Sequence, residues 1–69
     1  MDEGAKRVFC DLLAMKISEV YGVDLVRAKI GVLESGIQRI INEDPEYVDH
    51  VPLLSWAQDV YAEMILNKR

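Results

Sequence analysis

Apolar residues recur along this 69-residue chain at intervals of three and four, the period of an α-helix, and nowhere alternate over the length of a strand. Two stretches interrupt the pattern, one around Gly22 and one from Asp44 to Pro52. The pattern therefore predicts an all-α fold in a single helical domain over residues 1–69. We expect a three-helix bundle, with helices at about 4–21, 25–42 and 53–68 and a short extra helix near 45–50.

The expected helix ends carry recognisable signals. Gly22 occupies the usual left-handed position after a helix, and Asp24 can cap the helix that follows. Asp44 and Pro45 form a second start signal, with a capping side chain followed by proline at the first helical position. Pro52 comes too soon afterwards for that helix to be long.

The first helix is apolar around most of its circumference. Its polar strip is narrow, and its apolar positions are Val8, Phe9, Leu12, Leu13, Met15, Ile17 and Val20. A helix of this kind is covered on more than one side. The other helices of so short a chain can cover part of it, and a second chain could cover the rest.

The second helix shows a cleaner division between faces. Its apolar stripe, which we expect to face the core, consists of Val26, Ile30, Leu33, Ile37, Ile40 and Ile41. Gly36 lies at the edge of this stripe, where a missing side chain would let another backbone approach. Gly31 lies on the polar side, where the pattern suggests no role for a glycine.

The net charge and the short length of the chain limit the classes of function that it can have. Eight Lys and Arg against 12 Asp and Glu give a net charge of −4, which argues against nucleic acid as the main partner. A single cysteine excludes an internal disulfide, and we expect neither a metal nor a cofactor. The core of so small a domain is marginal, and oligomerisation is the remaining means of stabilising it.

These observations predict a non-enzymatic protein–protein interaction module that forms a homodimer. Its partner is a second copy of the chain, another protein or both. The residues expected at the interface are Phe9, Leu12, Leu13, Met15, Lys16 and Trp56. The acidic start at Asp2 and Glu3 is unlike a secretory or mitochondrial presequence, and no apolar run is long enough to span a membrane. We therefore expect a cytoplasmic protein.

An alternative is a helix-turn-helix regulator using residues 17–30. Ile17, Ser18 and the Gly22–Val23 pair follow the spacing of the turn in such proteins. The second helix would then present Arg27 and Lys29 to DNA. The bulky aliphatic residues beside them cannot form hydrogen bonds with a base edge.

His50 and Cys10 are the remaining candidates for chemistry. His50 could act as a general base or metal ligand with acidic neighbours, but no nucleophile or second nitrogen or sulfur ligand lies near it in sequence. Cys10 fits a small core or interface residue, and the adjacent Asp11 should raise the pKa of its thiol. Neither residue belongs to a catalytic motif.

Several spacings resemble a small bacterial family of all-helical proteins of unknown function, roughly sixty residues long. The matching positions are Phe9, Asp24, Gly36–Ile37, Tyr47, His50 and Gln58–Asp59–Val60. Asp49 departs from the family pattern, which has leucine before the histidine. The resemblance implies an accessory or antitoxin-like protein of a bacterial operon, and it implies no catalytic residue.

Overall fold

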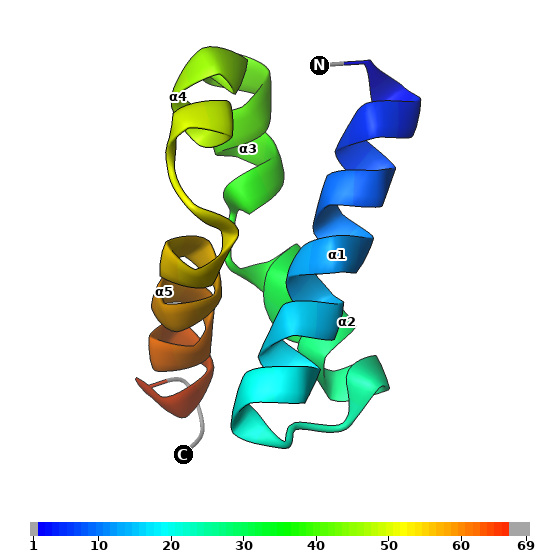
Figure 1. Ribbon diagram of the computed structural model, residues 1–69, viewed down its shortest axis with the longest axis vertical. Helices are drawn as coiled ribbons and strands as arrows, with labels where there is room; N and C mark the ends of the chain where they lie inside the picture. Colours follow the sequence, from blue (N-terminus) through cyan, green and yellow to red (C-terminus); the bar gives the residue numbers. More distant parts are fainter. Residues whose placement is uncertain (1, 67–69) are drawn as a thin grey trace.

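The longest helix, α1, spans Glu3–Tyr21 and runs along one side of the computed structural model, which describes residues 2–66 (Figure 1). Four more helices follow: α2 (Leu25–Glu34), α3 (Ile37–Glu43), α4 (Pro45–His50) and α5 (Leu53–Leu66). No strand occurs among the described residues, so the predicted all-α class is confirmed. The predicted end of the last helix, at residue 68, lies outside the described residues.

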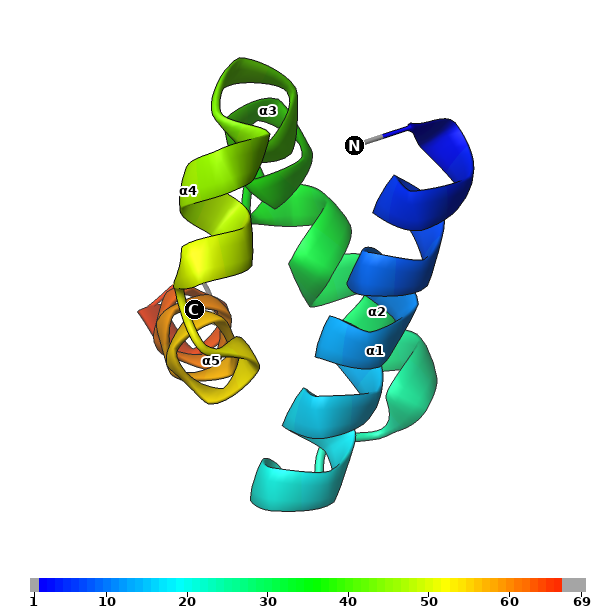
Figure 2. The same cartoon turned by 45° about the horizontal axis from the view of Figure 1, so that its top comes forward.

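The five helices surround one core. α1 packs against both α2 and α5, while α3 and α4 form a hairpin at one end of the molecule (Figures 1 and 2). The buried side chains come from all five helices: Leu13, Ala14, Ile17, Ala28, Val32, Ile37, Ile41, Val48, Trp56, Ala57 and Val60. The core is therefore shared along the full length of the chain.

Carboxylate caps begin three of the helices. The Ala5 N–H donates to Oδ1 of Asp2 at 2.7 Å at the start of α1, and the Val26 N–H donates to Oδ2 of Asp24 at 3.1 Å at the start of α2. Asp44 accepts from the Tyr47 N–H at 3.1 Å, with Pro45 at the first position of α4. The capping roles predicted for Asp24 and Asp44 are confirmed, and each cap satisfies an N–H that the helix itself leaves unpaired.

The predicted second helix, 25–42, is broken into α2 and α3 at Ser35 and Gly36. Gly36 has a φ of 80°, in the left-handed region, and Ser35 Oγ donates to the Val32 carbonyl at 2.7 Å. The same oxygen accepts from the Ile37 N–H at 3.2 Å. The expectation that Gly36 admits another backbone is wrong, because a Cβ there would meet no atom within 4 Å. Gly36 is needed for its backbone conformation.

The expected orientation of α2 is also wrong. The residues of α2 that face the core are the small ones, Ala28 and Gly31, together with Val32. Gly31 does not lie on a polar side: it is buried against Met64 of α5, and a Cβ at position 31 would lie 2.7 Å from Met64 Cγ. Gly31 lets α5 approach α2 closely, and the large apolar residues of α2 lie on the opposite side of the helix.

Two aromatic pairs join α5 to its neighbours. Trp56 Nε1 donates to the Val48 carbonyl at 3.3 Å, and the Tyr47 ring meets the Trp56 ring edge-on at 5.9 Å between centroids. Near the middle of α5, Tyr61 stacks on Tyr21 of α1 with centroids 3.9 Å apart. These contacts hold the first turn of α5 against α4 and its middle against the end of α1.

Candidate interaction surface

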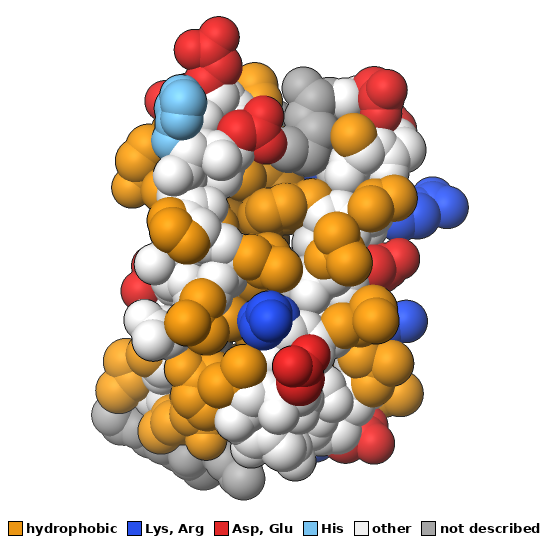
Figure 3. Space-filling model, viewed as in Figure 1, with side chains coloured by type: hydrophobic (Ala, Val, Ile, Leu, Met, Phe, Trp, Pro, Cys, Tyr) orange, Lys and Arg blue, Asp and Glu red, His pale blue; other side chains and the backbone are white. Residues whose placement is uncertain are grey.

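One apolar stripe lies on the side of α1 that points away from the core. It consists of Val8, Leu12 and Met15, spaced at i, i+4 and i+7, with exposed fractions of 57, 48 and 54%. We refer to these three residues as the outer α1 face. Figure 3 shows hydrophobic side chains gathered over α1 and along the line where α1 faces α5. A continuous exposed stripe of this kind marks a surface that binds something, whereas scattered apolar residues do not.

A second stripe lies on α2, on the side opposite Ala28 and Gly31. Val26, Ile30 and Leu33 repeat the same i, i+4, i+7 spacing, with exposed fractions of 64, 49 and 61%. We refer to these three residues as the outer α2 face. These residues were expected in the core, so the sequence reasoning missed them as surface residues. The signal that could have identified them is the row of small residues, Ala28 and Gly31, on the other side of the helix.

The structure divides the six predicted interface residues into two groups. Leu13 is fully buried between the helices, and Trp56 is only 6% exposed and hydrogen-bonded to Val48. Neither residue is therefore available to an interface, because the apolar surface of both is already covered within one chain. Leu12 and Met15 belong to the outer α1 face, and the half-buried Phe9 and Lys16 lie on α1 beside it.

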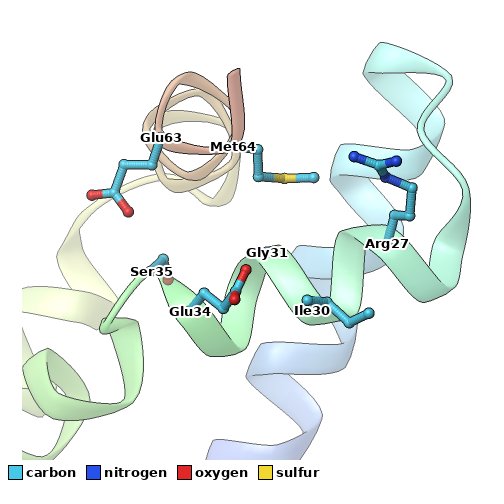
Figure 4. A pocket seen from close by; sticks show the side chains of 7 residues that line it. All are labelled: Arg27, Ile30, Gly31, Glu34, Ser35, Glu63 and Met64. Carbon is cyan, nitrogen blue, oxygen red and sulfur yellow. The ribbon is translucent and has the colours of Figure 1, made fainter. Parts of the chain in front are cut away.

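A groove of about 340 Å³ separates α2 from α5 beside the outer α2 face. Met64 reaches across from α5 toward Gly31, as Figure 4 shows. Arg27 and Glu34 line the groove from α2, and Glu63 lines it from α5. Among residues 2–66, neither Arg27 nor Glu34 forms an ion pair. This flank of α2 therefore carries one positive and one negative charge in an exposed position.

Cys10 lies half-buried on α1 in a shallow hollow shared with Lys29 and Gln38. Burial raises the pKa of the Cys10 thiol, the side chain of Gln38 opposes it, and the charge of Asp11 raises the pKa to a smaller extent than Gln38 lowers it, with Lys6 lowering it least. The predicted influence of Asp11 is confirmed. A thiol with a raised pKa is a poor nucleophile at neutral pH.

His50 ends α4 and is exposed. Within residues 2–66, no cluster of three or more His, Cys, Asp or Glu side chains could hold a metal ion. A groove between α4 and the start of α1 includes its neighbour Asp49 but not His50, and is lined otherwise by Asp2 and by small or apolar residues of α1. His50 therefore remains a single histidine with acidic neighbours.

Within residues 17–30, a left-handed glycine ends α1 and an aspartate cap begins α2. Gly22 is left-handed at φ 68°, its N–H donates to the Ser18 carbonyl at 3.0 Å, and α2 begins directly after Asp24. Arg27 and Lys29 are both exposed on α2. Between them lies the outer α2 face, which is apolar and offers no hydrogen-bonding group to a base.

None of the described helices combines the length and apolar character required to cross a membrane. No protein-family model matches the chain, and comparisons with curated proteins and with solved structures likewise find no match.

Proposed function

We propose that this chain is a non-enzymatic, cytoplasmic protein–protein interaction module that forms a homodimer and can also hold a second protein. The observation that carries the proposal is the pair of outward apolar stripes, the outer α1 face and the outer α2 face. Leaving six large apolar side chains in water costs free energy that burial against another chain would recover, at about 25 cal/mol per Å². A domain with two such faces can use one for each partner.

An accessory or antitoxin-like role is compatible with this proposal, because such a protein acts by covering the surface of a partner. The net charge of −4 gives no support to nucleic acid as the partner. The outer α1 face and the outer α2 face lie on different helices, so one partner need not displace the other.

Sedimentation equilibrium tests the proposal directly. Over loading concentrations from roughly 1 µM to several hundred µM, the average mass should rise from one chain toward two, because interfaces of modest area associate in this range. The circular dichroism spectrum should stay helical throughout. A single-chain mass at every concentration would contradict the homodimer.

The alternative, a DNA-binding regulator that uses Arg27 and Lys29, has its own measurement. Fluorescence anisotropy of a labelled random duplex at low salt, where non-specific binding is strongest, should show no binding. Salt-sensitive binding that is lost on substituting Arg27 and Lys29 by alanine would favour the regulator over the interaction module.

A further inference from the structure

We propose that the two copies of the homodimer are joined by the outer α2 face of each, with the two α2 helices antiparallel about a two-fold axis. This inference rests on the proposed function and specifies which of the two apolar faces mediates self-association. The outer α1 face is then left exposed in the dimer for another protein.

The charges beside the outer α2 face support a second copy as its occupant. Arg27 and Glu34 are seven residues apart, close to two helical turns, so they lie on the same flank and about 10 Å apart along the axis. When a second α2 runs in the opposite direction, its Glu34 lies beside Arg27 and its Arg27 beside Glu34. The midpoint of the pair falls next to Ile30, in the middle of the apolar stripe.

The surroundings of this flank fit the same arrangement. Glu63 of α5 lines the groove together with Glu34, so an arginine arriving from the second copy meets two carboxylates. On the other flank of α2, Lys29 takes no part in these pairings. An isologous contact repeats each of these pairings twice.

A parallel arrangement is less favourable on the same grounds. It would place Lys29 beside Glu34 of the second copy but leave Arg27 without an acidic counterpart, because Glu34 is the one acidic residue of α2. It would also align the dipoles of the two α2 helices, whereas the antiparallel arrangement opposes them. The two arrangements therefore differ in which basic residue of α2 supports the dimer.

The size of the face sets the expected affinity. α2 has ten residues and is about 15 Å long. Exposed Ile65 of α5, beside Arg27 in an adjoining groove, can extend the apolar contact. An interface of this extent falls at the small end of specific complexes, so we expect a dissociation constant on the order of tens of micromolar.

Charge-reversal variants, compared with a control variant of the same net charge, give the decisive experiment. Sedimentation equilibrium measures the dissociation constant of each variant. Arg27→Glu should weaken the dimer about tenfold, Glu34→Arg should do the same, and the double variant should recover most of the loss. Lys29→Glu is the matched control: it makes the same change in net charge on the opposite flank, and it should leave the dissociation constant within about twofold. Ile30→Gln should weaken the dimer by at least tenfold. All these positions are exposed, and a thermal melt of each variant checks that it folds.

Other outcomes overturn the inference in distinguishable ways. If Lys29→Glu weakens the dimer and Arg27→Glu does not, the helices are parallel. If Ile30→Gln has no effect while Leu12→Gln dissociates the dimer, the outer α1 face joins the copies, and the inference fails although the proposed function stands. If the wild-type chain is monomeric throughout, self-association itself is excluded.

Discussion

The side chain of Met64 on α5 lies where a Cβ would project from Gly31 on α2. A Cβ at position 31 would come within 2.7 Å of Met64 Cγ and 3.0 Å of Met64 Cε, and nearer still to the sulfur. Real Cβ atoms essentially never approach a neighbour so closely, so a side chain at position 31 would have to displace Met64. The contact lies on the buried side of α2, opposite the outer α2 face.

Gly31→Ala should therefore stabilise the fold by less than the helix propensity of alanine alone would give. The gain in helix propensity is about 1 kcal/mol, and displacing the flexible Met64 side chain offsets part or all of it, so we expect little net change in the free energy of unfolding. Urea denaturation measures the free energy of unfolding. Met64→Ala should remove the contact, so Gly31→Ala in that background should show the full gain, and an equal gain in both backgrounds would contradict the contact.

Gly36 should respond for a different reason. Its φ of 80° is costly for residues with a Cβ, and no neighbouring atom lies within 4 Å of the place where a Cβ would project. Gly36→Ala should cost about 1 kcal/mol, and Gly36→Asn should cost less because asparagine tolerates the left-handed region. Met64→Ala should not alter the effect of Gly36→Ala, in contrast to that of Gly31→Ala. Equal losses for the alanine and asparagine variants would argue against backbone strain.

Helix positions and caps could be predicted from the sequence because they depend on local signals. Asp24, Asp44 and Pro45 act within three residues of themselves, and the structure shows them at helix starts. The orientation of α2 could not be predicted in the same way. It depends on how α2 packs on α1 and α5, and this packing includes the contact of Gly31 with Met64, 33 positions farther along the chain.

The candidate surface shows the same limit. Leu12 and Met15 were predicted at an interface from the apolar excess of the first helix, and both are exposed. The outer α2 face was assigned to the core, because a stripe of large apolar residues usually is buried. Reading the small residues of α2 as the packing face would have reversed that assignment, since close helix contacts need small side chains on the buried side.

The thiol of Cys10 should react slowly with alkylating reagents in the folded protein. Burial raises its pKa, with Asp11 adding to the effect, so the folded chain holds the neutral thiol more strongly than the unfolded chain does. This contribution to stability is fully present below the pKa of the unfolded thiol and is lost as pH rises through the folded pKa. Alkylation by iodoacetamide, measured against pH with and without urea, should show its midpoint at higher pH in the folded protein. Asp11→Asn should lower the folded midpoint, and identical folded and unfolded profiles would contradict the burial of the thiol.

Leu12 and Leu13 are neighbours in sequence with opposite roles, which allows folding and association to be separated by the same substitution. Leu13 is fully buried, so Leu13→Ala should lower the free energy of unfolding by about 2–5 kcal/mol. Leu12 is 48% exposed on the outer α1 face, so Leu12→Ala should change the stability of the monomer by less than about 1 kcal/mol. If α2 joins the two copies, Leu12→Ala should also leave the dissociation constant of the dimer unchanged. Urea denaturation and sedimentation equilibrium on the same two variants check both expectations, and a large loss of stability in Leu12→Ala would mean that the outer α1 face is covered within a single chain.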